Sequence, residues 1–183
     1  MHSTRLTPDQ IRDYLARSYT AVDGLWFMKT EERFGFDEAL QIDENVWRVM
    51  PKIQARHLRS ALGAGPGLEG LLACYAEKLF LDGFDFQILP HCPPQSESGT
   101  EGAGGEGAET ELAIRISFCP WADKLARSNR GHLAQVIGGR ICAAEYAAWA
   151  EEFGCRFEFG GERKCRGEGE KCMLRFSYKR LTP

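Results

Sequence analysis

The sequence predicts an α+β fold, in which an N-terminal helical portion at residues 1–82 packs with a small antiparallel sheet covered by two helices. Over residues 1–82, apolar residues recur with the period of amphipathic helices. From residue 83 to residue 183, four short segments instead alternate apolar and polar residues, as half-buried strands do. Because 183 residues is an ordinary domain size, we expect both portions to form one compact unit.

The first helix is expected to begin at TPDQ, residues 7–10. Thr7 can cap the helix, Pro8 suits the first turn, and Gln10 completes a capping box. The segment GLWFM at 24–28 places four large apolar residues together, so it is either buried on all sides or lines a cavity. Gly35 is expected to end this segment.

Further helices are expected before residue 83. Asp37 is expected to cap a helix that Pro51 ends, and the next helix is expected to stop at Gly63. The glycine-rich GAGPG at 63–67 reads as a turn, and residues 68–81 have the pattern of another helix.

The second portion, residues 83–183, contains strand and helix patterns around one segment with almost nothing to bury. Residues 93–110 are rich in Gly, Glu and Ser, which is typical of a flexible surface loop between paired strands. The predicted strands are 84–89, 111–118, 155–159 and 172–178, and the predicted helices are 121–128 and 131–153.

Composition excludes several classes of function. The formal net charge of -3 and the pI near 5.9 argue against nucleic acid as a partner. The N-terminus does not read as a signal peptide, and no apolar run is long enough to span a bilayer, so we expect no membrane partner and a cytoplasmic location. Motifs for nucleotides, dinucleotides and serine hydrolases are absent.

The chain contains seven cysteines, and five of them lie from residue 119 onward. An odd number of cysteines without an export signal favours reduced thiols, metal ligands or redox-active thiols over a disulfide framework. Glu162, Cys165 and Cys172 surround a short Gly/Glu turn, and Cys142 lies on the helix upstream. Soft thiolates with a carboxylate suit zinc, whereas small buried core cysteines are the alternative interpretation.

Two further groups could carry catalysis. Glu145 shares a helix face with Cys142 and Trp149, in an otherwise apolar stretch, so it is either a buried carboxylate with a function or a solvent-facing residue. Cys119 and His132 could act as nucleophile and base or bind zinc, and the alternative is a buried thiol beside a helix-capping histidine.

An apolar ligand pocket is a further hypothesis. Aromatic residues at helical spacing are typical of a core as well as of a pocket. Asp23 lies next to the GLWFM segment and is interpreted as a surface or capping acid unless the pocket lies there. The candidate pocket residues are Trp26, Phe27, Trp47, Tyr146 and Trp149.

The tail ERKCRGEGEKCMLRF, preceded by ICAAEYAAWAEEFG, resembles the four-vinyl-reductase-type domain of bacteriochlorophyll-pathway proteins and of sensory modules in aromatic-responsive transcription activators. In the sensory members, a structural zinc is held by a cysteine near the long helix, a glutamate and two hairpin cysteines. The resemblance implies the zinc ligands Cys142, Glu162, Cys165 and Cys172 here, with Cys119 as the alternative to Glu162.

Nearly the whole chain, except residues 93–110, resembles a family of uncharacterised prokaryotic proteins related to L-2-amino-thiazoline-4-carboxylate hydrolases. The segments that carry this resemblance are VDGLWFMKTEERFGFDEAL, PKIQAR, CPW and CAAEYAAWA. The resemblance matches Cys119, His132, Cys142 and Glu145 to the recurring pattern of that family and assigns none of them a catalytic role.

These observations predict a cytosolic protein that binds a partly apolar small molecule and carries a zinc site at its C-terminal hairpin. One alternative is a metal-dependent hydrolase of a small cyclic amide-like or thiazoline substrate, in which an open zinc position activates water and Glu145 or His132 handles the proton. Another is an iron–sulfur or thiol redox protein that uses Cys119, Cys142, Cys165 and Cys172. Whether the chain forms a homodimer stays open.

Overall fold

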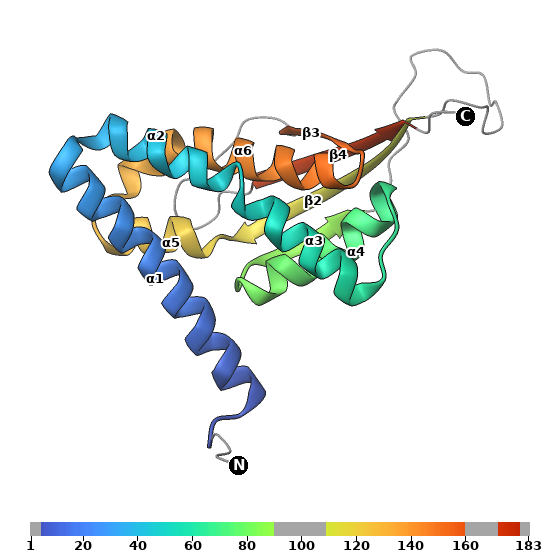
Figure 1. Ribbon diagram of the computed structural model, residues 1–183, viewed down its shortest axis with the longest axis horizontal. Helices are drawn as coiled ribbons and strands as arrows, with labels where there is room; N and C mark the ends of the chain where they lie inside the picture. Colours follow the sequence, from blue (N-terminus) through green and yellow to red (C-terminus); the bar gives the residue numbers. More distant parts are fainter. Residues whose placement is uncertain (1–4, 90–108, 160–171, 180–183) are drawn as a thin grey trace.

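The computed structural model describes residues 5–89, 109–159 and 172–179, and it confirms the α+β class (Figure 1). Residues 93–108 of the predicted loop 93–110 and the predicted turn with Glu162 and Cys165 lie outside these residues, and residues 109–110 belong to the second strand. The helices are α1 (Pro8–Phe34), α2 (Phe36–Trp47), α3 (Met50–Leu62), α4 (Gly67–Leu81), α5 (Pro120–Arg127), the short 3₁₀ helix η1 (Gly131–Leu133) and α6 (Ala134–Glu152). The strands are β1 (Asp85–Leu89), β2 (Glu109–Phe118), β3 (Arg156–Phe159) and β4 (Cys172–Lys179).

The sheet is antiparallel, with the strand order β1-β2-β4-β3. Strands adjacent in sequence pair with each other at its two sides, as the alternating segments predicted. The central pairing joins β2 to β4, with Ile114 opposite Leu174 and Ile116 opposite Cys172. Ile114 and Leu174 are fully buried, so the alternation of β2 and β4 turns one face of the sheet toward the core.

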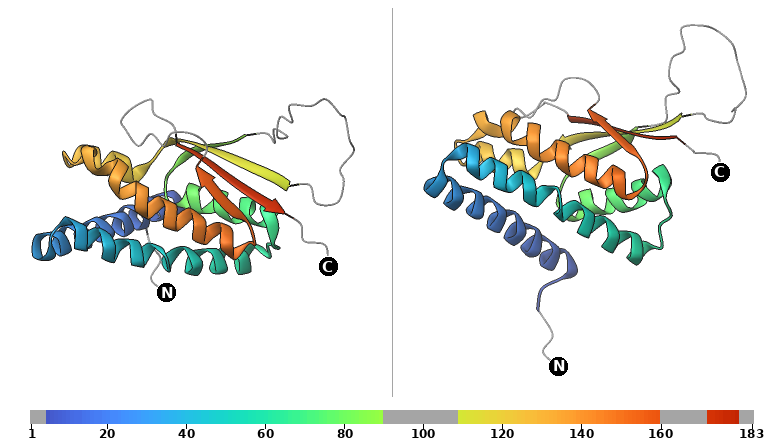
Figure 2. Two further views of the ribbon diagram at one scale, coloured as in Figure 1. Left: turned by 90° about the horizontal axis from the view of Figure 1, so that it is seen from above. Right: turned by 45° about the horizontal axis from the view of Figure 1, so that its top comes forward.

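The helices α4 and α6 form a layer that covers the core-facing side of the sheet. α4 and α6 contribute Tyr75 and Trp149 to the same buried cluster as the central strands. In Figure 2, α6 lies between the sheet and the run formed by α2 and α3. The two portions 1–82 and 83–183 therefore share one core, because α4 comes from the first and α6 from the second.

The ends of α1 follow the capping chemistry in the sequence. Thr7 and Gln10 form the predicted capping box, and Gly35 closes the helix with φ 89°. Gly35 also precedes the first turn of α2, so the prediction that Asp37 caps α2 is wrong. Asp37 instead lies inside the first turn, where its negative charge interacts favourably with the positive end of the helix dipole.

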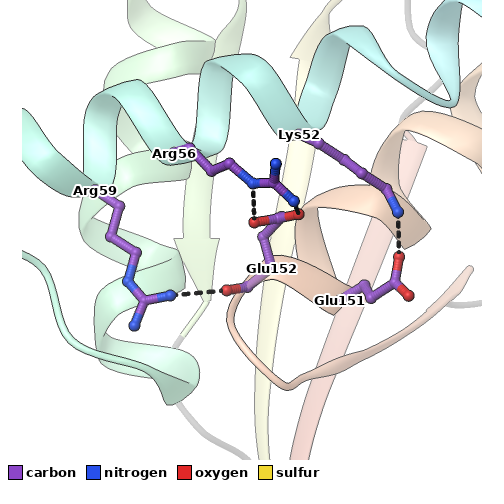
Figure 3. A network of polar contacts seen from close by, with 5 residues as sticks. All are labelled: Lys52, Arg56, Arg59, Glu151 and Glu152. Atoms are coloured by element: carbon purple, nitrogen blue, oxygen red, sulfur yellow. Dashed lines mark hydrogen bonds and ion pairs between the residues drawn. The ribbon is translucent and has the colours of Figure 1, made fainter.

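Ion pairs join α3 to the end of α6 (Figure 3). Lys52 Nζ lies 2.8 Å from Glu151 Oε2, and Arg56 donates to both carboxylate oxygens of Glu152, at 2.8 and 2.7 Å. Arg59 donates to the Glu152 carbonyl at 3.1 Å. The basic side chains of α3 therefore contact another helix of the same chain, at the surface of the protein.

Large apolar side chains remain exposed along α1, which extends away from the other helices at its N-terminal end (Figure 1). Tyr14 is 64% exposed and Leu15 is 58% exposed. In the described part of the chain, no helix combines the length and the apolarity needed to cross a membrane.

Candidate functional site

A cavity of about 440 Å³ lies among α1, α2, α5 and α6. This volume is within the range of small-molecule sites in proteins, roughly 300–1,000 Å³. α1 contributes residues spaced three or four apart, including Thr20, Gly24, Phe27 and Met28, so a single face of this helix forms one wall. The opposite wall comes from α6 through residues such as Ile137 and Ile141.

Aromatic rings form much of the apolar lining. Phe27, Trp47 and Trp121 come from three different helices and all face the cavity. The rings of Trp47 and Trp121 meet edge to face, with centroids 5.7 Å apart. Because Trp47 is only 3% exposed, these contacts hold the rings in place beside the cavity.

The pocket residues predicted from the sequence separate into two groups. Phe27 and Trp47 line the cavity. Trp26 does not, and it is 72% exposed, because adjacent residues point about 100° apart around a helix. Tyr146 and Trp149 are buried on the other side of α6, in the core that faces the sheet, so the interpretation as core residues holds for them.

Two carboxylates, Asp23 and Asp43, line the cavity from α1 and α2. Burial raises the pKa of Asp23 to about 6, and a hydrogen bond with Trp47 lowers it in part. Burial and the charge of Asp23 raise the pKa of Asp43 to about 7, again against a hydrogen bond with Trp47. The exception stated for Asp23 therefore applies, because the cavity lies beside this carboxylate, whereas Asp43 was missed although it lies one helical turn before Trp47.

Glu145 is buried, as its apolar neighbourhood indicated, and it lines the cavity. Its partner is Lys78 of α4, which is 2% exposed and donates to Glu145 Oε1. Lys78 also lies 3.3 Å from Asp82 Oδ2. Burial lowers the pKa of Lys78, but Glu145 and Asp82 outweigh it, so the net pKa is raised and the ammonium stays charged. Burial raises the pKa of Glu145, and Lys78 partly offsets this effect.

A tyrosine hydroxyl lies close to these charges. The Tyr19 hydroxyl oxygen is buried and has no hydrogen-bond partner within residues 5–89, 109–159 and 172–179. Burial and the nearby negative charges of Asp82, Glu145 and Asp23 raise its pKa, so the hydroxyl keeps its proton. The Tyr19 hydroxyl is thus a neutral donor near these carboxylates, although Tyr19 is not among the residues that line the cavity.

The candidate metal ligands are only partly within the described residues. Cys142 of α6 and Cys172 of β4 are half-buried against the sheet-side core. Both side chains pack against one buried cluster, which contains Tyr75 and Tyr146. Glu162 and Cys165 lie outside the described residues.

No group of three or more His, Cys, Asp or Glu side chains suited to a metal exists within residues 5–89, 109–159 and 172–179. Cys119, Cys142 and Cys172 are all described, so they do not form such a group.

The candidate catalytic residues are not all brought together. Cys119, at the end of β2, lines the cavity together with Cys142 and Glu145. His132 is exposed on η1 and is not among the residues that line the cavity. The structure therefore does not place Cys119 and His132 in one site.

Residues 5–88 match a family model described as "Family of unknown function (DUF6125)". The matched segment contains the walls that α1 and α2 contribute to the cavity, and it ends within β1. A search of curated proteins and a search of solved structures found no significant match.

Proposed function

We propose that this protein binds a small, largely apolar molecule in the cavity among α1, α2, α5 and α6. The observation that carries this proposal is a cavity of about 440 Å³ that is walled mostly by aromatic and aliphatic side chains. Burial of an apolar ligand against such a wall supplies binding free energy, and a few polar groups select its orientation.

We also propose a structural zinc held by Cys142, Glu162, Cys165 and Cys172. Cys142 and Cys172 supply soft sulfur ligands beside one buried cluster, and the resemblance to the four-vinyl-reductase-type sensory domain supports the other two. With four protein ligands, the ion would tie the strand end to α6 and leave no position open for water. Reduced thiol ligands fit a cytoplasmic location, which we include in the proposal.

The binding proposal is tested with the neutral fluorescent probe N-phenyl-1-naphthylamine. A Cβ added at Gly24 would meet no atom within 4 Å, and Gly24 lies in the middle of the α1 face that lines the cavity. We expect Gly24→Phe to fill the space and abolish the fluorescence increase. Gly24→Ala is the matched control and should keep it. Equal probe binding by both variants would contradict the proposal.

The zinc proposal is tested by plasma mass spectrometry on protein without a tag. About one zinc per chain is expected, with loss of metal and of thermal stability together in Cys142→Ser, Cys165→Ser and Cys172→Ser. Cys155 is buried outside the proposed set, so Cys155→Ser is the control and should retain zinc. An unchanged zinc content in Cys165→Ser would remove this assignment.

A hydrolase of a small cyclic amide-like or thiazoline substrate is the second candidate. It is favoured by one observation: Cys119, Cys142 and Glu145, three positions matched to the thiazoline-hydrolase-related family, line the same cavity. Consumption of 2-amino-thiazoline-4-carboxylate, followed by chromatography, would support it if Cys119→Ala or Glu145→Gln abolished the reaction. Absence of turnover by protein that binds the fluorescent probe would favour the binding function.

A further inference from the structure

We infer that the ligand of this cavity carries a protonated amine, held between Asp23 and Asp43, on an apolar body that lies against the aromatic wall. This inference rests on the proposed binding function and adds the chemical class of the ligand. It stands on where the two carboxylates lie, on the charges around them and on the rings beside them.

Asp23 and Asp43 come from different helices and face one cavity, yet no Lys or Arg of the described residues forms an ion pair with either. The neighbouring Glu44 shows the contrast, because it is paired with both Arg48 and Arg140. Asp23 and Asp43 are half-buried, and carboxylates that are withdrawn from water are ordinarily paired with a cation. The cavity therefore contains two carboxylates for which the described chain supplies no counter-ion.

The two carboxylates are close enough to act as one site. Both carboxylates line the same cavity as Trp47, and the charge of Asp23 raises the pKa of Asp43. One indole N–H is a single donor, whereas two carboxylates offer four acceptor oxygens. Most of this acceptor capacity is left for a ligand with several N–H donors, as an ammonium group has.

The wall beside these carboxylates also suits an ammonium group. Cations are attracted to the faces of aromatic rings, most strongly to tryptophan. Trp47, Trp121 and Phe27 line the cavity, and the guanidinium carbon of Arg130 already lies 5.9 Å from the centroid of the Phe27 ring. A hard divalent cation fits less well, because it needs about six oxygen ligands.

Other charged groups also line the cavity, but they do not neutralise the negative charge of Asp23 and Asp43. Glu145 is paired with Lys78, so its charge is balanced within the protein. On the side of α5, Lys124 and Arg130 line the cavity, and Arg130 lies 2.6 Å from Glu31. Lys124 could accept an anionic group at the other end of a ligand, but it makes no ion pair with the aspartates in the described residues.

The experiment measures displacement of N-phenyl-1-naphthylamine by 4-phenylbutylamine and by the neutral 4-phenylbutanol at pH 8. We expect the amine to compete about tenfold more effectively, which corresponds to roughly 1.4 kcal/mol. This preference should disappear in the double variant Asp23→Asn with Asp43→Asn, which should still bind the alcohol. Glu38→Gln removes an exposed charge from the same helix as Asp43 and should keep the preference.

The pH dependence provides a second readout. Asp43 takes up a proton as the pH falls through about 7, and Asp23 as it falls through about 6, so the preference for the amine should fall toward that of the double variant at pH 5. Displacement by the alcohol should stay constant.

The possible results separate the two levels of the proposal. Equal displacement by amine and alcohol in the wild-type protein would overturn the amine assignment and leave the cavity as a binding site. A preference that survives in a folded double variant, checked by circular dichroism, would also overturn it. If the probe itself does not bind, the proposed function fails and the amine assignment fails with it.

Discussion

The two sides of α6 differ in how completely they are packed. Toward the sheet, Trp149 is fully buried and stacks with Phe153 at an interplanar angle of 3°. Toward α1 and α2, Ile141 and Trp47 belong to a smaller cluster that borders the cavity. One helix thus forms a densely packed interior on one side and leaves space for a ligand on the other. We conclude that the first side provides most of the stability, while the second provides the binding site.

The largest loss of stability is expected for Trp149→Ala, on the sheet side of α6. Removal of a fully buried tryptophan costs about 3–5 kcal/mol, from lost burial and the cavity left behind. Trp121→Ala, in the half-buried wall of the binding cavity, should cost clearly less but weaken probe binding. Urea unfolding and fluorescence titration measure the two effects. Equal losses of stability in both variants would contradict the division.

The buried pair of Lys78 and Glu145 joins the two sides, because it lies in the interior and also reaches the cavity wall. Lys78→Met leaves Glu145 and Asp82 without their cation, so we expect a loss of roughly 3 kcal/mol in the free energy of unfolding. The double variant Lys78→Met with Glu145→Met should recover part of this loss. A double variant less stable than Lys78→Met would show that the charges are not coupled.

A smaller effect is expected from Asp43 on the cavity side. Burial raises its pKa to about 7 in the folded protein, above the value near 3.9 of an unfolded aspartate. The folded state therefore binds the proton more tightly, and the stability from this group is present below pH 4 and is lost as the pH rises through about 7. Asp43→Asn should raise the free energy of unfolding by about 1 kcal/mol at pH 8 and change it little at pH 4. A variant that is destabilised equally at both pH values would contradict this assignment.

The smallest effect is expected at the surface network between α3 and α6. Lys52→Gln removes an exposed ion pair with Glu151 and should change the free energy of unfolding by less than about 1 kcal/mol. The change should shrink further in 1 M salt, because salt screens exposed charges. A loss as large as that of Lys78→Met would show that the α3 network, and not the interior, holds α6 in place.

The features of the fold that could be predicted are those that depend on neighbouring residues: helix caps, glycine turns and strands. The capping box of Thr7 and Gln10 and the left-handed turn at Gly63 depend on neighbouring residues alone. The alternating segments predicted all four strands, and the predicted ends differ from the observed ends by no more than two residues. The prediction that Asp37 caps α2 was wrong because Gly35 is the only residue between α1 and α2 and occupies the cap position itself.

The candidate site was predictable only in part. The interpretation of GLWFM as a buried or cavity-lining segment found Phe27, but it could not separate Phe27 from the exposed Trp26, since both have the same composition signal. Asp23 was connected with a pocket only on condition that one lies beside it, and Asp43 was not recognised, because a carboxylate on an amphipathic helix is ordinarily solvated. Two of the proposed zinc ligands, Cys142 and Cys172, pack against one buried cluster, and their assignment stays a prediction.

The sequence alone determined the classes of element and their order, because helix caps, glycine turns and the period of apolar residues act over a few neighbouring positions. Only the tertiary structure decided that β2 pairs with β4 and that Lys78 meets Glu145, since these contacts join distant segments. It also decided which side of each helix lines the cavity. That choice depends on how α1, α2, α5 and α6 pack together, and burial in the resulting space is what perturbs Asp23 and Asp43.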